Sequence, residues 1–154
     1  MKIRKATNKD AAKISKLILN TLNKVNSKDY TKRQLAIEKK NHTASKIKRE
    51  LKKKIFFVLL DKKQIVGVVQ LDLKEKAIDR LFLNQKYLKK GFGIKLMNHV
   101  ENYAIKRKIR KFMLYPTDYA LKFYKKMGYK IVRKFIGTRN GGYPVIEMQK
   151  TLKK

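Results

Sequence analysis

Apolar residues recur along this chain with two different spacings, and each change of spacing marks a predicted element. Short apolar runs at Ile55–Leu60 and Ile65–Leu71 flank a polar turn at Asp61–Gln64, which predicts a β-hairpin. After Gly91 the apolar positions fall on one face of a helical period, so a helix is expected to begin at this glycine turn. The residues on that face are Leu96, Met97, Val100, Tyr103 and Ala104.

Turn signals divide much of the remaining chain. The glycine-rich Gly137–Gly142 is expected to form the flexible tip of a hairpin between Tyr129–Ile136 and Tyr143–Thr151. This tip either closes over a bound acceptor or serves only as a turn. The least regular stretch is Asn23–Lys53, which is dense in lysine and carries apolar residues at helical spacing. These residues are Leu35, Ile37, Ile47 and Leu51.

The strand expected at Ala77–Leu83 departs from strict alternation. Ile78 and Leu81 are apolar and three residues apart, whereas a regular strand repeats a face every two residues. One extra residue in a strand is accommodated as a β-bulge, and this spacing predicts one here.

A basic, glycine-punctuated turn follows that strand. A helix that opens at Gly91–Phe92–Gly93 leaves its first backbone N–H groups without intrahelical partners, and these groups can point at an anion. Glycine lets a phosphate approach the backbone, while Lys89, Lys90 and Lys95 add positive charge. The turn is therefore interpreted as a pyrophosphate cradle. The alternative is that its glycines only solve a packing problem.

A second segment, Thr117–Tyr129, follows the strand-like Lys111–Tyr115. Together with the glycine turn it resembles the GNAT superfamily of acetyl-coenzyme A-dependent N-acetyltransferases. Gly91 and Gly93 match the glycines of that family's Gln/Arg-x-x-Gly-x-Gly/Ala phosphate loop. The family's Asn-x-x-Ala-x-x-Phe-Tyr-x-Lys-x-Gly-Phe helix is matched at Ala120, Phe123, Tyr124, Lys126, Gly128 and the aromatic Tyr129. The chain departs from these patterns at Leu88, in place of Gln or Arg, and at Thr117, in place of Asn.

The resemblance covers nearly the whole chain in element order, from Ile3–Asp10 and the helical Ala12–Leu22 to a closing strand at Tyr143–Leu152. It implies a mixed α/β (α+β) GNAT fold, in which helices flank a twisted, mostly antiparallel sheet. The central strands Ala77–Leu83 and Lys111–Tyr115 would splay around acetyl-coenzyme A. The coenzyme-binding residues that it implies are Phe82, Leu83, Lys89, Lys90, Gly91, Phe92, Gly93, Ile94, Thr117 and Phe123.

Acetyl transfer to an amine needs an acid for the leaving thiolate, a donor for the oxyanion and a base. By the same resemblance, the Tyr124 phenol is the acid, although an aromatic residue beside Phe123 can also be core packing. A backbone N–H from about Phe82 or Leu83, aimed by the bulge, would meet the acetyl carbonyl. Asp79 is the candidate base, and a water relay or an already neutral amine is an equal alternative.

Three other residues with chemistry-bearing side chains receive no catalytic role. Tyr129 is expected in the core. His99 falls on the polar side of its helix with Lys95 and is expected to be solvated, and His42 lies in the irregular basic stretch.

Composition narrows the remaining possibilities. A chain of 154 residues is expected to form one domain, spanning residues 1–154. With no cysteine and two histidines it offers neither disulfides, thiol catalysis nor a cysteine/histidine zinc site, and no metal is expected. No apolar run approaches the roughly 18 residues of a membrane span, and the N-terminus lacks the apolar core of a signal peptide. A cytoplasmic protein, monomeric or homodimeric, is expected.

The net charge of +31 bears on partners. It arises from 42 Lys and Arg against 11 Asp and Glu, and 34 of the basic residues are lysine. Such a field attracts polyanions and opposes polyamines and aminoglycosides as acceptors. Lysines spread over every element favour nonspecific nucleic-acid or ribosome association over dedicated recognition.

The expected function is acetyl transfer to a primary amine, with a protein N-terminus or lysine favoured. The alternatives are a small acidic amine and a catalytically weak RNA- or ribosome-binding module.

Overall fold

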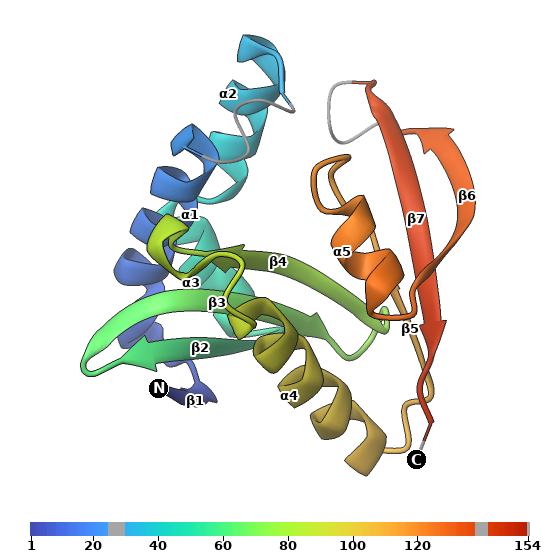
Figure 1. Ribbon diagram of the computed structural model, residues 1–154. Coiled ribbons are helices and arrows are strands. Elements are labelled where there is room, and N and C mark those ends of the chain that lie inside the picture. The colour runs from blue at the N-terminus through green and yellow to red at the C-terminus, as the bar shows by residue number, and fades with distance from the viewer. Residues whose placement is uncertain (25–29, 138–141, 154) are drawn as a thin grey trace.

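The computed structural model describes residues 1–24, 30–137 and 142–153, and an open sheet of seven strands forms the centre of these residues (Figure 1). The sheet has the order β1-β2-β3-β4-β5-β7-β6. The strands are β1 (Lys2–Lys5), β2 (Ile55–Asp61), β3 (Gln64–Asp72), β4 (Ala77–Leu83), β5 (Lys111–Leu114), β6 (Lys130–Ile136) and β7 (Pro144–Thr151). The expected mixed fold with a mostly antiparallel sheet is confirmed.

The sheet divides into two halves that separate from each other. β1 to β4 pair antiparallel in sequence order, and β5, β7 and β6 form a second antiparallel set. β4 and β5 are parallel and pair only at Ala77 and Met113, beside a hydrogen bond from Met113 N–H to the Lys76 carbonyl. Beyond this point the two strands diverge, as the upright β5–β7 set in Figure 1 shows. The predicted splay of the central strands is therefore present.

Helices cover both faces of the sheet. They are α1 (Ala11–Lys24), α2 (Lys32–Asn41), α3 (Ala44–Leu51), α4 (Phe92–Lys106) and α5 (Leu121–Lys126), with short 3₁₀ turns η1 (Asn8–Asp10) and η3 (Gln85–Tyr87). Alternation along β2 separates two cores, because successive side chains point to opposite faces. Phe56 and Val58 pack with α1 and α3, whereas Phe57 and Leu59 pack with α4 and α5.

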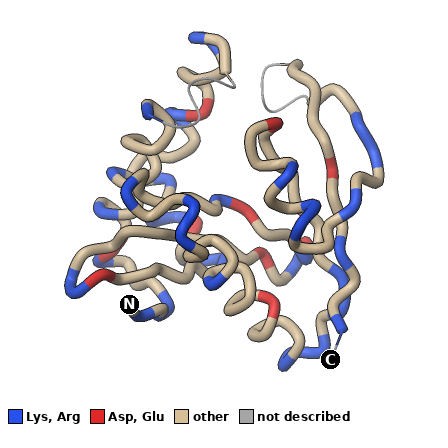
Figure 2. Tube along the Cα trace, viewed as in Figure 1, with Lys and Arg blue, Asp and Glu red and all other residues tan. Residues whose placement is uncertain are grey.

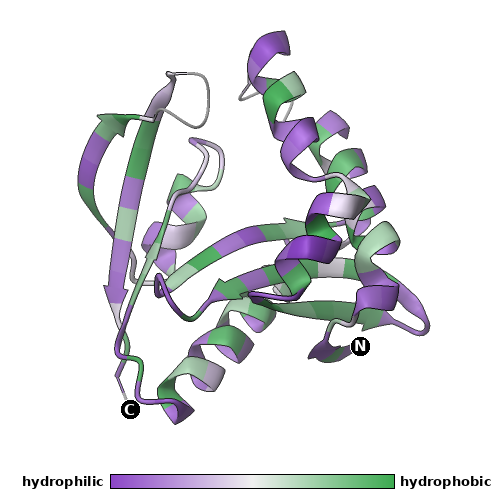
Figure 3. Cartoon of the chain, turned by 180° about the vertical axis from the view of Figure 1, so that it is seen from behind, coloured by the Kyte–Doolittle hydropathy of each residue, from purple (hydrophilic) through white to green (hydrophobic). Residues whose placement is uncertain are grey.

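The predicted apolar face of the helix after Gly91 is the face that α4 buries. Leu96, Met97, Val100 and Ala104 are fully buried, and Tyr103 is half-buried against the ring of Phe57. Bands of hydrophobic and hydrophilic residues alternate along this helix (Figure 3). The boundaries predicted for β2 to β7 agree with the structure to within one or two residues.

The basic stretch Asn23–Lys53 is more regular than its sequence suggested. The structure contains two helices there, α2 and α3, each opened by a threonine cap. The Thr31 hydroxyl accepts from the Gln34 N–H at 3.1 Å, and the Thr43 hydroxyl accepts from the Lys46 N–H at 3.3 Å. The caps satisfy backbone donors that short polar helices would otherwise leave to water. Most of the predicted hairpin tip, residues 138–141, lies outside the described residues.

Positive charge is distributed rather than clustered. Figure 2 shows lysine and arginine on the helices, strands and connecting segments of both halves. Among the described residues, no helix is both long and apolar enough to cross a membrane.

Candidate active site

A cavity of about 760 Å³ opens where β4 and β5 diverge. Its walls come from β4, from the end of β5 with the residues after it, from α5, and from the α2–α3 region. The central lining residues are Ile78, Asp79, Arg80, Leu81, Phe82, Leu114, Tyr115, Thr117 and Tyr124. The cavity therefore joins residues that lie far apart in the sequence.

β4 contains the predicted bulge, and the bulge lies on the cavity wall. Val68 pairs with Phe82 and Gln70 with Asp79, so Arg80 and Leu81 together oppose the single residue between Val68 and Gln70. Arg80 has a φ of +50°, in the left-handed region that a residue with a Cβ rarely adopts. Such a conformation persists only where surrounding contacts hold it.

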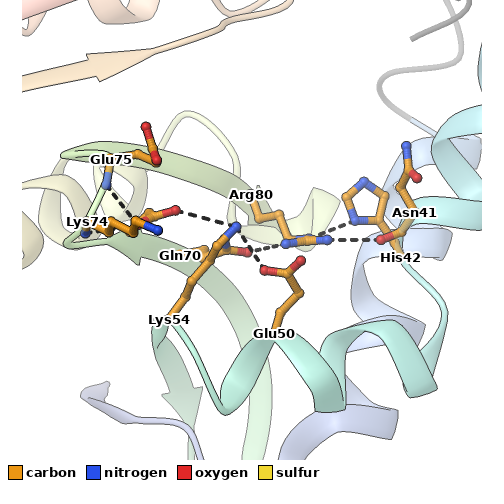
Figure 4. Close-up of polar contacts among 9 residues, drawn as sticks. Asn41, His42, Glu50, Lys54, Gln70, Lys74, Glu75 and Arg80 are labelled. Carbon is orange, nitrogen blue, oxygen red and sulfur yellow. Dashed lines mark hydrogen bonds and ion pairs between the residues drawn. The ribbon is translucent and has the colours of Figure 1, made fainter. Parts of the chain in front are cut away.

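The Arg80 guanidinium makes those contacts (Figure 4). Its Nε donates to His42 Nδ1 at 3.0 Å, one terminal nitrogen donates to the Asn41 carbonyl at 2.9 Å, and the other donates to the Gln70 amide oxygen. The bonds to His42 and Asn41 connect the bulge to the junction of α2 and α3, and the bond to Gln70 connects it to β3. The strained residue is thus fixed at three points.

His42 is the partner that completes this network, and it was assigned no role from the sequence. It is buried, and burial lowers its pKa, so the imidazole is neutral at neutral pH. Because Nδ1 accepts from Arg80, the proton is on Nε2, which faces the Glu38 carboxylate at 3.3 Å. No local sequence pattern around His42 predicts its contact with Arg80, which lies 38 residues away.

Asp79 lies half-buried on the cavity wall. Burial raises its pKa above the ordinary aspartate value, and the charges of Lys54 and Arg80 only partly oppose this shift. In the described part of the chain its carboxylate makes neither a hydrogen bond nor an ion pair. A carboxylate with a raised pKa and no internal partner is available to accept a proton.

Tyr124 lies on the α5 side of the same cavity. It is buried, and its ring packs edge-to-face against Phe123 and Tyr129, with centroid separations of 5.1 and 5.9 Å. Burial raises the pKa of its phenol well above the usual value, and the nearby negative charge of Asp79 raises it further. The phenol stays protonated at neutral pH and can donate a proton, so the acid and base candidates line one cavity.

The glycine turn forms the beginning of α4. Gly91 has a φ of +84°, and a Cβ built there would meet nothing within 4 Å, so the approach to the helix N-terminus is open. The first N–H groups of the helix lack intrahelical partners and carry its partial positive charge. Ile94 is 47% exposed on the first turn, and Lys89 and Lys90 are exposed before it. This is the geometry expected of an anion cradle.

Gly93 has a different surrounding from Gly91. It is buried, and a Cβ there would lie 3.3 Å from Phe123 Cζ and 3.5 Å from Leu83 Cδ1. Gly93 therefore permits close packing of α4 on β4 and α5. Of the predicted coenzyme residues, Phe82 and Thr117 line the cavity, and Leu83 and Phe123 pack beside Gly93. Lys89, Lys90, Gly91, Phe92 and Ile94 form the separate turn.

Thr117 has a local partner, since its hydroxyl accepts from the Ala120 N–H at 3.3 Å.

Two further expectations concern residues outside the cavity. Tyr129 is a core residue as predicted, and its hydroxyl donates to Glu101 at 2.9 Å. The expectation that His99 is solvated was wrong. Its ring is half-buried against Phe57 at 4.7 Å between centroids, because it lies at the edge of the buried face of α4.

No group of three His, Asp or Glu side chains suited to a metal ion occurs within the residues that the structure describes.

Comparisons with known proteins agree with this geometry. A family model described as an acetyltransferase (GNAT) domain matches residues 26–152. The uncharacterized protein YxbD of Bacillus subtilis (strain 168) is 33% identical over 82 residues, which are 51% of this chain and 52% of YxbD. The alignment thus spans about half the length of this curated relative.

Solved structures share the fold over almost the full length of the chain. A GCN5-related N-acetyltransferase from Rhodopseudomonas palustris superimposes with a TM-score of 0.89 at 20% identity, covering 98% of this chain and 95% of that one. The PaiA N-acetyltransferase from Thermoplasma acidophilum, solved in complex with coenzyme A, gives a TM-score of 0.80 at 18% identity, covering 98% and 99%.

Proposed function

The chain belongs to the GNAT acetyltransferase family, and from this premise we propose that it transfers an acetyl group from acetyl-coenzyme A to a primary amine. One observation carries the proposal: the Asp79 carboxylate, whose pKa is raised by burial, and the Tyr124 phenol, which stays protonated at neutral pH, line a single cavity at the splay of β4 and β5. Membership of the family supplies the expectation of the coenzyme. The placement of the two side chains supports proton transfer from the amine to Asp79 and from Tyr124 to the leaving thiolate.

The coenzyme would reach this cavity from the glycine turn. The open N-terminus of α4 supports binding of the pyrophosphate, with Lys89 and Lys90 adding charge. The backbone of Phe82 and Leu83, on the strand that runs into this turn, would bind the pantetheine arm. The acetyl group would then lie beside the bulge.

Direct attack by the amine accounts for every proton. The neutral amine nitrogen forms a bond to the acetyl carbon, and the carbonyl oxygen becomes an oxyanion held by a bulge N–H. As the carbon–sulfur bond breaks, Tyr124 gives its proton to the departing thiolate. Asp79 takes the proton that the nitrogen loses. Return of a proton to Tyr124 from water, and loss of one from Asp79, restores the starting state.

Arg80 is a positioning residue in this scheme, because it holds the bulge that aims the N–H. Replacing it with Met, Arg80→Met, removes three hydrogen bonds and leaves the strained φ without support. We expect kcat to fall at least roughly tenfold, with KM for acetyl-coenzyme A nearly unchanged, since the loss is confined to transition-state contacts.

Lys108→Met is the matched control for this variant. Lys108 also has a left-handed φ, +62°, but lies after α4 and does not line the cavity. Steady-state kinetics of both variants test the positioning role of Arg80. An unchanged kcat in Arg80→Met would show that Arg80 has no such role.

The coenzyme assignment is tested at Ile94. A new carboxylate in Ile94→Glu would lie on the first turn of α4, where it opposes a pyrophosphate. The same charge stabilises the helix N-terminus by about 0.3–1 kcal/mol, so the fold should persist. We expect the affinity for coenzyme A, measured by calorimetry, to fall at least roughly tenfold.

Asn98→Glu adds the same charge one turn later on the exposed side of α4 and should bind coenzyme A normally. Equal affinities in the two variants would refute the cradle. Gly93 is a poorer test site, because any side chain there also disturbs the packing of Phe123.

A further inference from the structure

The charges on the cavity wall are of both signs. The basic side chains are Lys46, Arg49, Lys52, Lys53, Lys54 and Arg80, and the acidic ones are Glu38, Glu50 and Asp79. Three of the chain's 11 acidic residues thus gather here, although the protein as a whole carries +31. The cavity wall is therefore richer in acidic residues than the chain as a whole. The positions of its charges indicate which ligand the cavity can bind.

Several of these charges are satisfied within the protein. Lys54 pairs with Glu50 at 2.9 Å (Figure 4). Its Nζ also lies 3.5 Å from a carboxylate oxygen of Asp72. Glu38 faces His42 at 3.3 Å, and Arg80 is held by its three hydrogen bonds. These groups are occupied in building the wall.

Lys46 donates to the Asn41 amide oxygen at 3.2 Å. Four further charged groups on the wall form neither a side-chain hydrogen bond nor an ion pair in the described ranges. One is the Asp79 carboxylate on β4. The others are Arg49, on α3, and Lys52 and Lys53, which directly follow this helix and are exposed. None of these three cations forms an ion pair with a carboxylate there. The cavity thus has one unpaired negative group and a separate group of unpaired positive ones.

This arrangement selects a ligand of complementary charges. An amine that must lose a proton is favoured next to Asp79, whereas a second positive group on the same molecule would meet Arg49, Lys52 or Lys53. A carboxylate or phosphate on the acceptor would instead pair with these cations, and arginine suits such groups by its planar fork of donors.

We propose that the acceptor is an amine that also carries an anionic group, recognised by Asp79 at the amine and by Arg49, Lys52 and Lys53 at the anion. This inference rests on the proposed acetyltransferase function and narrows its acceptor. A free amino acid and a protein N-terminus followed by an acidic residue share this chemistry. Polycationic amines do not.

The test compares a panel of acceptors with the wild-type protein. The reaction is measured by the release of the coenzyme A thiol from acetyl-coenzyme A. β-Alanine, β-alanine amide and 1,3-diaminopropane are compared as small acceptors with an anionic, a neutral and a cationic second group, and three C-terminally amidated peptides carry Glu, Gln or Lys at the second position. We expect kcat/KM to be about tenfold higher for the acidic member than for the neutral one, and lowest for the basic one. The set with the higher absolute values identifies the source, small molecule or protein.

A charge reversal shows which residues set the preference. Arg49→Glu should remove the preference for the acidic acceptor or invert it, with the affinity for coenzyme A unchanged. Lys48→Glu makes the same charge change on α3 at a residue that does not line the cavity, and it should keep the wild-type order.

The outcomes separate this inference from the proposed function. Acetylation without an acidic preference, or an equal loss of preference in Arg49→Glu and Lys48→Glu, overturns the acceptor class and leaves acetyl transfer intact. Coenzyme binding with no acetylation of any panel member also overturns it. Failure to bind coenzyme A at all refutes the proposed function itself.

Discussion

Replacing Tyr124 with phenylalanine is expected to lower kcat by roughly 10²- to 10⁴-fold, with little change in KM for acetyl-coenzyme A. The substitution removes the proton for the leaving thiolate but keeps the ring that packs against Phe123 and Tyr129. Within the described residues the Tyr124 hydroxyl has no hydrogen-bond partner, so its removal should leave the melting temperature nearly unchanged. A large kinetic loss without a stability loss identifies a catalytic phenol.

Tyr129→Phe is the matched control for this prediction. It makes the same chemical change in the same aromatic cluster, but there it breaks the hydrogen bond to buried Glu101. We expect a stability loss of about 1 kcal/mol and an unchanged kcat for the folded protein. If Tyr124→Phe retained full activity, Tyr124 would be a packing residue only.

Replacing Asp79 with asparagine is expected to lower kcat/KM about 10²-fold or more near neutral pH. Asparagine keeps the size of the side chain but cannot accept the proton of the amine. The pH profile provides the specific readout. Because burial raises the pKa of Asp79, the wild-type carboxylate becomes protonated at a higher pH than an ordinary aspartate.

The sign of the pH effect follows from this shift. The base works only when it is deprotonated, so wild-type kcat/KM should fall as pH decreases through the raised pKa, and this acidic limb should vanish in Asp79→Asn. Glu75→Gln, an exposed change in the turn before β4, should retain both the rate and the limb. An unaltered limb in Asp79→Asn would assign the proton to water or to the amine.

Much of the scaffold could be predicted because it follows from local spacing. The three-residue separation of Ile78 and Leu81 indicated a bulge in this strand. The structure contains it at Arg80 and Leu81, with Arg80 in the left-handed region. The apolar face after Gly91 indicated the buried face of α4. Both features depend on residues within a few positions of one another, which is the range that a periodic pattern can report.

The support of the bulge could not be predicted in this way. His42 and Arg80 are 38 residues apart, and they meet because β4 and the α2–α3 junction pack together in three dimensions. The left-handed conformation of Arg80 is equally hidden, since arginine has no preference for it and tertiary contacts impose it. The same limit explains why α2 and α3 were not separated, because the polar α2 buries no residue fully.

Titration of the protein with acetyl-coenzyme A by calorimetry, at about 0.5 M salt, tests the central claim most directly. High salt screens the attraction of a +31 protein for any polyphosphate, whereas hydrogen bonds in a defined site survive. We expect saturable one-to-one binding that persists in wild-type protein and Asn98→Glu and is strongly weakened in Ile94→Glu. Binding that disappears with salt, or that is equal in all three proteins, would contradict the account.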